Sequence, residues 1–316
     1  MTDEVTQWIR NHAHRLASLD PQAPPADLRP LADMARDARV VAMGDACRQT
    51  HELSVVSHRI VRLLVEELGF RTLALEGDDA SRVGLDEYVR TGTGDPRALL
   101  AEARSFWRTE EILDVLRWMR SYNRRHPDDP VRFVGVAPSR RFTSGHDGLA
   151  GIERGLAEET LRWYEHTGDR IVYWGGLAHT ANGAARTVSP SSPPLTHRNA
   201  GSRLRERFGS GYVSIGLTFH HGTAPYPVPA PPPEFADALL GSAGPEAYLL
   251  DLRADVPDRV GAWLGTPTRT RLIGPDYDPR DDAAYHMSGG SLADWFDAVV
   301  HVREVTPVRP LRDEDG

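Results

Sequence analysis

Short β-rich runs alternate with amphipathic helical patterns along most of the 316-residue chain. Between the first runs, residues 51–68 and 109–123 carry apolar side chains at helical spacing, and Gly69 is placed to end the first helix. This alternation favours an α/β fold with a mostly parallel, doubly wound sheet flanked by crossover helices. The predicted strands are residues 39–43, 72–76, 131–136, 171–174, 212–219, 248–252 and 298–302.

The pattern has no internal repeat and no convincing linker, so we predict a single α/β domain over residues 1–316. Two proline-rich stretches, residues 189–194 and 225–233, cannot continue a central strand or a helix and are predicted loops. The second is a candidate to line or cover a site. Residues 312–316 are expected to form a disordered acidic tail.

Composition excludes several kinds of chemistry. The formal net charge of -8 argues against a nucleic-acid partner, because clustered basic residues neutralise phosphate backbones. All 37 basic residues are arginine, and the chain has no lysine. Schiff-base formation, pyridoxal-phosphate anchoring and the P-loop all need a lysine, so those mechanisms are excluded. No cofactor is predicted.

Targeting and metal signals are also absent from the sequence. The single cysteine, Cys47, rules out an intrachain disulfide and a cysteine zinc site. The N-terminus lacks the basic and apolar regions of a secretory signal, and no run approaches the ~18 apolar residues of a membrane span. We therefore expect a soluble, cytoplasmic protein that has no membrane contact and binds no metal.

Ionisable residues follow the predicted strands at the sheet edge where open α/β proteins bind ligands. Asp45 and Arg48 follow the first strand, Glu76 ends the second, and His179 follows the fourth after two glycines. Each has a structural alternative, such as a capping role for Asp45 or a solvated loop position for Arg48 and His179. Glu76 ends an apolar strand, where a carboxylate is costly unless paired or functional. Their convergence predicts that these four residues are catalytic.

Arg140 and Arg141, after the third strand, would clamp an anion or else carry surface charge. His220 and His221 are adjacent on a strand and should face opposite ways, so no metal pair is expected. Cys47 would need a nearby base to act as a nucleophile, and packing is the simpler interpretation. The residues predicted to bind substrate are Glu52, Arg140, Arg141 and His220.

Five segments, in order, resemble the erythromycin esterase-like family. Residues 44–52, Gly-Asp-Ala-Cys-Arg-Gln-Thr-His-Glu, resemble the family's Gly-Glu-x-x-His-Gly-x-x-Glu run. The resemblance covers roughly residues 40–311. It implies a doubly wound α/β fold and a metal-independent hydrolytic pocket that opens lactone or ester bonds. The other four segments are residues 68–76, 107–135, 174–179 and 295–311.

Departures from the family pattern change the expected chemistry. Arg48 stands where the family has its water-activating histidine, and Asp45 is one methylene shorter than the family's glutamate. Gly176 and Leu177 replace a histidine and an asparagine of the fourth segment, and Ala137 replaces an aspartate. The family residues retained are Glu52, Glu76 and His179.

Arginine cannot act as a general base near neutral pH, but its forked donors suit sulfate, phosphate or carboxylate. The leading hypothesis is therefore a cyclase or lyase of secondary metabolism that expels an anion, for example sulfate with closure of an aziridine ring. Asp45 or Glu76 would be the base, while Arg48 and His179 would hold the leaving group. The expected partner is a small-molecule substrate bearing an anionic group, and the sequence indicates no protein partner.

Two alternatives remain open at the sequence level. One is an ester or lactone hydrolase of the erythromycin esterase type, in which Glu76 or His179 has become the base. The other is a catalytically inactive binding protein that retains the fold, since one fold hosts many functions.

Overall fold

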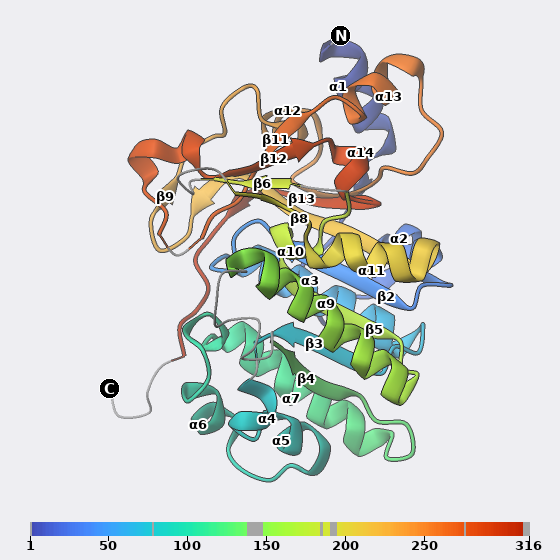
Figure 1. Ribbon diagram of the computed structural model, residues 1–316, viewed down its shortest axis with the longest axis vertical. Coiled ribbons are helices and arrows are strands. Elements are labelled where there is room, and N and C mark those ends of the chain that lie inside the picture. The colour runs from blue at the N-terminus through green and yellow to red at the C-terminus, as the bar shows by residue number, and fades with distance from the viewer. Residues whose placement is uncertain are drawn as a thin grey trace.

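The computed structural model describes residues 2–77, 79–137, 148–183, 186–189, 195–274 and 276–311. Within these residues the centre is a nine-stranded sheet, and the predicted α/β fold class is confirmed (Figure 1). Its six strands from β13 to β4 run parallel, and two antiparallel strands complete one edge. The strands in spatial order are β1 (His14–Arg15), β10 (Ala247–Asp251), β13 (Ala298–Val305), β8 (Tyr212–Thr223), β2 (Val40–Asp45), β5 (Ile171–Gly176), β3 (Thr72–Glu76) and β4 (Arg132–Val136), with β9 (Pro227–Val228) paired to the end of β8.

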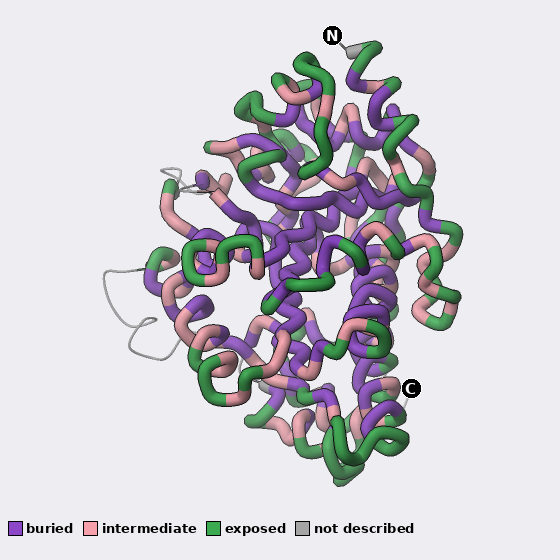
Figure 2. The backbone as a smooth tube through the Cα atoms, turned by 90° about the vertical axis from the view of Figure 1, so that its right-hand side faces the viewer, coloured by how far each residue is buried: buried purple, intermediate pink, exposed green. Residues whose placement is uncertain are grey.

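Strand residues alternate between two hydrophobic layers, one on each face of the sheet. Val41 and Met43 of β2 join the apolar cluster that includes α3 (His51–Glu66) and α7 (Glu110–Arg125). Val40 and Ala42 join the smaller cluster against α9 (Gly148–Thr167) and α11 (Ala200–Phe208). Figure 2 shows the result, a buried interior with exposed residues concentrated at the loops. The parallel strands are thus covered on both faces, as their uninterrupted apolar runs require.

The remaining helical segments connect the strands and flank the central sheet with its two helical layers. In the described parts of the chain, no helix is both long enough and apolar enough to cross a membrane. These segments are α1 (Thr2–His12), α2 (Arg29–Ala35), α4 (Asp79–Arg82), α5 (Leu85–Thr91), α6 (Pro96–Ala101), α10 (Leu177–Thr180), α12 (Ala236–Ala243), α13 (Asp258–Leu264) and α14 (Leu292–Trp295), with 3-10 turns η1 (Pro25–Leu28), η2 (Ser105–Trp107), η3 (Gly209–Gly211) and η4 (Pro279–Ala284).

The predicted helices begin and end where local signals place them. Thr109 caps α7, its hydroxyl accepting the N–H of Ile112 at 3.2 Å. Helix α3 ends at Glu66, two residues before the predicted boundary, and Gly69 then takes the left-handed conformation with a φ of 72°. The strand β3 has the predicted bounds, whereas β8 and β13 extend beyond theirs.

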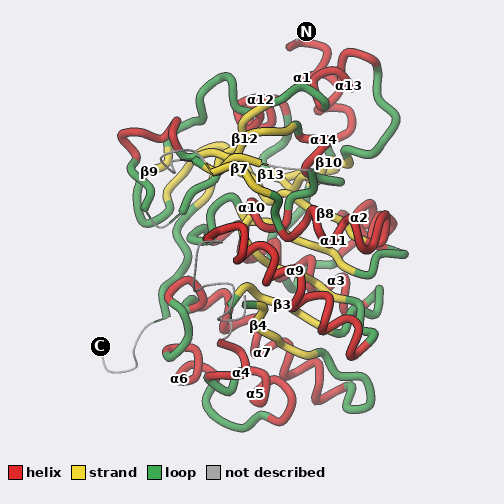
Figure 3. The backbone as a smooth tube through the Cα atoms, in the orientation of Figure 1, coloured by secondary structure: helices red, strands yellow, loops and turns green. Residues whose placement is uncertain are grey.

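A second sheet, of four antiparallel strands in the described residues, has no counterpart in the sequence prediction (Figure 3). Its strands have three to five residues and carry little apolar alternation. In β12, for example, only Met287 of His-Met-Ser-Gly-Gly is buried. The strands in order are β11 (Thr268–Arg271), β12 (His286–Gly290), β6 (Arg186–Val188) and β7 (Leu195–His197).

The proline-rich stretch 225–233 contains the short edge strand β9. Within it, the Tyr226 hydroxyl lies 3.1 Å from Gln49 Oε1 and 3.2 Å from the Gly274 carbonyl, so the stretch contacts the loop that follows β2. Most of the other stretch, residues 190–194, and the predicted tail, residues 312–316, lie outside the described residues.

Gly44 marks the closest approach of β2 to α10. A Cβ there would lie 2.1 Å from Thr180 Oγ1 and 2.7 Å from Leu177 Cα, so Gly44→Ala should lower the free energy of unfolding by about 3 kcal/mol. Urea denaturation beside Gly261→Ala measures this. In α13 a Cβ at Gly261 meets only Val256 Cγ2 at 3.5 Å, so that alanine should leave stability unchanged or raise it by about 1 kcal/mol. Equal stabilities for the two variants would contradict the packing argument.

Candidate active site

The candidate site forms where three neighbouring strands end. In the sheet, β5 lies between β3 and β2, so their carboxyl ends meet at one edge. Asp45, the last residue of β2, is in register with Gly176, the last residue of β5. Glu76 ends β3, and His179 lies on α10, which begins directly after β5. The sheet order therefore brings these predicted residues together, as the rule for open α/β sheets requires.

Arg48 reaches back from the loop after β2 to the end of β3. Its Nη2 donates to Glu76 Oε2, and its guanidinium lies over the Phe106 ring at 4.8 Å from the ring centre. The position depends on Gly176, because a Cβ there would lie 2.9 Å from Arg48 Nη2 and 3.3 Å from His179 Cδ2. Glycine at 176 thus provides the space that the guanidinium occupies.

His179 lies between two carboxylates. Its Nδ1 lies 2.8 Å from Glu153 Oε1, and its Nε2 lies 3.5 Å from Glu76 Oε1. Glu153 projects from α9 and is fully buried. It also accepts hydrogen bonds from Arg186 Nη2 and from the backbone N–H of Ala200, the latter at 2.8 Å.

Asp45 has a different environment from the other carboxylates. Trp174 Nε1 donates to its Oδ2 at 2.7 Å, while Oδ1 is buried and has no hydrogen-bond partner among the described residues. Burial raises the pKa of Asp45 to about 7, although the hydrogen bond from Trp174 and the charge of Arg48 oppose that rise. Asp45 is therefore an oriented carboxyl that can exchange a proton near neutral pH.

Glu76 and His179 are held in their charged forms. Burial acts to raise the pKa of Glu76, but the charges of Arg48 and His179 and the N–H of Gly176 outweigh it and hold that pKa below its usual value. Burial likewise acts to lower the pKa of His179, but the charges of Glu153 and Glu76 leave it raised. The shifts favour the carboxylate form of Glu76 and the imidazolium form of His179, which face each other.

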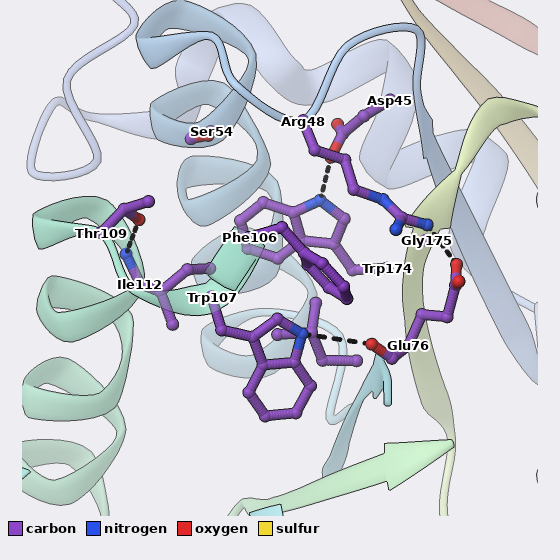
Figure 4. Close-up of a pocket in the computed structure, with 11 residues that line it drawn as sticks. Asp45, Arg48, Ser54, Glu76, Phe106, Trp107, Thr109, Ile112, Trp174 and Gly175 are labelled. Carbon is purple, nitrogen blue, oxygen red and sulfur yellow. Dashed lines mark hydrogen bonds and ion pairs between the residues drawn. The ribbon is translucent and has the colours of Figure 1, made fainter. Parts of the chain in front are cut away.

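A small cavity of about 20 Å³ adjoins this cluster (Figure 4). Its walls include three aromatic side chains, and the indole Nε1 of one of them, Trp107, donates to the backbone carbonyl of Glu76 at 3.1 Å. His179 is not among the lining residues and contacts the cavity only through Glu76. The polar lining residues used below are Asp45, Arg48 and Glu76, and the aromatic ones are Phe106, Trp107 and Trp174.

Of the residues predicted to bind substrate, Glu52 and His220 are not among those that line this cavity. Glu52 lies outside it, in a groove along α3 and α7, and its carboxylate accepts the N–H and the hydroxyl of Thr306, each at 2.6 Å. His220 lies on β8 and packs against Gly241. Arg140 and Arg141 lie outside the described residues.

The expectation that His220 and His221 face opposite ways is wrong. Their Nδ1 atoms are 2.9 Å apart, and the rings are nearly perpendicular. Strand β8 stays paired with β13 as far as Gly222, although Gly222 itself has a φ of 145°. Cys47 is buried, and burial raises the pKa of its thiol to about 12, which disfavours the nucleophilic thiolate.

Sequence reasoning missed Glu153, Arg186 and the hydrogen bond that Trp174 gives to Asp45. A signal for Glu153 was available, because it shares the apolar face of its helix with Leu156 and Ala157, three and four residues further on. A carboxylate on such a face needs a partner. Among the described residues, no group of three or more histidine, cysteine, aspartate or glutamate side chains is arranged to hold a metal ion.

The fold and the site together define a doubly wound α/β protein with a cluster of buried ionisable residues at the carboxyl edge of its parallel strands. The chain belongs to the erythromycin esterase family, whose family model matches residues 65–151 and 142–305. The resemblance found in the sequence is thereby confirmed.

Three similar proteins give the extent of the likeness. The erythromycin esterase type II of Escherichia coli is 25% identical over 130 residues, which are 41% of this chain and 30% of that protein, so the chain spans less than a third of this relative's length. The crystal structure of a Bacillus cereus protein has a TM-score of 0.82 at 21% identity, covering 98% of this chain and 99% of that one. A mutant of the erythromycin esterase EreC in its open conformation has a TM-score of 0.64 at 15% identity, covering 92% and 96%. These structures show the shared fold.

Asp45 should destabilise the folded protein increasingly as pH rises. Its folded-state pKa of about 7 exceeds the ordinary value of 3.8, so stability present at low pH is lost between those values. Asp45→Asn keeps an acceptor for Trp174 and removes the ionisation. The variant should gain stability relative to wild type as pH rises, by up to about 4 kcal/mol above pH 7. Urea unfolding across this pH range measures the difference.

Glu76→Gln is the control, because its stability relative to wild type should change with pH in the opposite direction. The pKa of Glu76 is lowered in the folded protein, so its contribution is present above the unfolded pKa and lost as pH falls. This variant should be least stable relative to wild type at neutral pH, and the difference should shrink in acid. A pH-independent difference for Asp45→Asn would contradict the raised pKa of Asp45.

Proposed function

We propose that this protein hydrolyses an ester or lactone bond in a small molecule, with Asp45 as the general base. The observation that carries the proposal is the buried Oδ1 of Asp45, which has no hydrogen-bond partner in the described part of the chain. It belongs to a carboxyl whose pKa is raised to about 7, in a residue that lines the cavity. A general base acts best when its pKa lies near the operating pH. The name of the E. coli relative, an erythromycin esterase, supports the same bond type.

In the proposed reaction, water lies between Asp45 Oδ1 and the substrate's carbonyl carbon. Asp45 takes a proton from the water as the water oxygen bonds to that carbon. The intermediate then breaks its bond to the alkoxy oxygen, and Asp45 returns the proton to this leaving oxygen. The products are a carboxylic acid that contains the water oxygen and an alcohol, on one molecule if the substrate is a lactone.

Arg48 supplies the positive charge for the intermediate's oxyanion. It lines the cavity and shares the single carboxylate of Glu76 with a second cation, His179, so the three side chains carry net positive charge. Within the described part of the chain, only Nη2 of Arg48 hydrogen-bonds to a protein group, which leaves Nη1 and Nε for substrate. Charged donors that are already oriented stabilise such an oxyanion without reorganisation.

The contacts of Glu76 and His179 argue against either of them as the base. Glu76 already accepts from Arg48 and lies beside His179, and its lowered pKa makes it a poor proton acceptor. His179 has a carboxylate at each ring nitrogen, so both nitrogens carry protons. Of the ionisable groups in this cluster, Asp45 remains as the one that can exchange a proton.

Cyclisation with loss of sulfate, the leading hypothesis from the sequence, has no support from the related proteins. It assigns His179 to a departing anion, whereas each ring nitrogen of His179 faces a carboxylate and His179 does not line the cavity. The aromatic walls formed by Phe106, Trp107 and Trp174 instead favour a substrate with an apolar or aromatic part near the scissile bond.

Turnover in oxygen-18 water separates these reactions. The panel contains aryl esters, alkyl esters, lactones and aminoalkyl sulfates, with products analysed by mass spectrometry. Hydrolysis should place one label in the carboxylic acid of an ester or lactone product. Release of sulfate from a ring-closed product without label would overturn the proposal in favour of cyclisation. Absence of turnover across the panel would favour the binding-protein alternative.

Asp45 as base predicts the pH profile of the same hydrolysis. Because the ionised form is active, kcat/KM should rise about tenfold per pH unit in acid and level off above an apparent pKa of about 7. Asp45→Asn should lower kcat by roughly 10²- to 10⁴-fold. Asp251→Asn is the matched control, since Asp251 also ends a strand but pairs with Ala298 at the start of β13, on the opposite edge of the sheet. Retained kcat in Asp45→Asn would exclude Asp45 as the base.

A further inference from the structure

Glu153 lies at the centre of a buried network behind the cavity. Its side chain has no solvent exposure, and its two oxygens accept from His179, Arg186 and the N–H of Ala200. A buried carboxylate without such partners would be costly, because desolvation opposes its charge. Burial acts to raise the pKa of Glu153, but the charge and hydrogen bond of His179 and the charge of Arg186 hold it well below its usual range. Glu153 is therefore ionised.

The partners of Glu153 are themselves fixed. Arg186 is 2% exposed, and its Nε donates to the carbonyl of Ala178. Its Nη1 donates to His197 Nε2 at 3.1 Å. Side chains from β6, β7 and α10 and a backbone N–H of α11 thus surround the carboxylate, so Glu153 has little freedom to move away from His179.

This arrangement fixes the orientation and the charge of His179. With Nδ1 held by Glu153, the Nε2 edge of the ring is directed at Glu76. The charged groups that face the imidazole are Glu153 from α9, Glu76 from β3 and Arg48 from the loop after β2. Two carboxylates against one arginine favour the imidazolium.

We propose that Glu153 is a positioning residue that holds His179 as an oriented imidazolium, so that His179 shares the charge of Glu76 and leaves Arg48 cationic towards the substrate. The effect on catalysis depends on the proposed hydrolysis, whereas the effect on His179 does not. If Glu153 lost its charge, His179 would become neutral near neutral pH, and Glu76 would neutralise Arg48 more completely. Oxyanion stabilisation would weaken although no residue lining the cavity had changed.

The direct test is ¹H–¹⁵N NMR of the histidine ring nitrogens in the full-length protein, with His179 assigned from its missing signals in His179→Gln. In the wild type, both ring nitrogens of His179 should carry protons at about pH 7, because two carboxylates raise the pKa of the ring. In Glu153→Gln, which keeps an acceptor for Ala200, the ring should titrate at least about one pH unit lower. Unchanged titration in the variant, or a neutral ring in the wild type at about pH 7, would overturn the proposal.

Two further variants separate the effect of the Glu153 charge from a general effect on folding or on the helix. Glu153→Asp retains the charge and should restore the titration of His179 at least in part, and it replaces Glu153→Gln if that variant fails to fold. Glu159→Gln is the matched control, because Glu159 is on the same helix but pairs with Arg162. It should leave both the spectrum and turnover unchanged. A change as large as that of Glu153→Gln would assign the effect to the helix rather than to Glu153.

Activity supplies a separate readout. Glu153→Gln should lower kcat about tenfold or more with little change in KM, and its loss should grow as pH rises through the new pKa of His179. The NMR measurement needs no substrate. A protein that hydrolyses nothing but shows the His179 shift would refute the proposed function and support the role of Glu153. A protein that hydrolyses an ester or lactone but shows no His179 shift would support the proposed function and refute the role of Glu153.

Discussion

The structure of the site depends on charges of alternating sign that run from the cavity into the protein interior. Arg48, Glu76, His179, Glu153 and Arg186 follow one another, each in contact with the next. They come from the loop after β2, from β3, α10, α9 and β6, so the series joins both sheets and the helix on one face. Removing any one charge would leave its neighbours buried and unbalanced, which is costlier than losing a surface ion pair. The same interactions that hold these elements together thus determine which groups are ionised at the cavity.

Asp45 lies beside this series without joining it by a hydrogen bond to any of its members in the described residues. Its one side-chain partner there is the neutral donor Trp174, so burial dominates and the carboxyl stays near the point of ionisation. Two residues that depart from the family pattern, Arg48 and Gly176, lie near Asp45. Arginine at 48 removes a neutral base and adds a fixed cation, and glycine at 176 leaves room for that cation. Under the proposed hydrolysis, Asp45 takes the role of proton acceptor that the arginine at 48 cannot fill.

Elements with strong local periodicity could be predicted from the sequence, and elements without it could not. The apolar run Thr72–Glu76 and the capped helix Glu110–Arg125 contain their own signals, namely β-rich composition and a threonine cap. The second sheet has no such signal, because strands such as His286–Gly290 are stabilised by pairing with segments about a hundred residues away. The contact between the rings of His220 and His221 likewise has no signal in the local sequence pattern.

For the site, the sequence by itself determined which ionisable residues follow parallel strands, and hence that Asp45, Arg48, Glu76 and His179 meet at one edge. Only the tertiary structure decided their roles. Whether a carboxylate is ionised depends on the donors that surround it, and those come from distant elements: Glu153 meets His179 across 26 residues, and Trp174 meets Asp45 across 129. Glu52 shows the limit of prediction from the sequence. It belongs to the family-like segment 44–52, yet its carboxylate accepts hydrogen bonds from Thr306 and does not face the cavity. The order of residues along the chain determines which side chains lie at the carboxyl edge of the sheet. The packing of distant elements determines the electrostatic surroundings, and so the pKa, of each one.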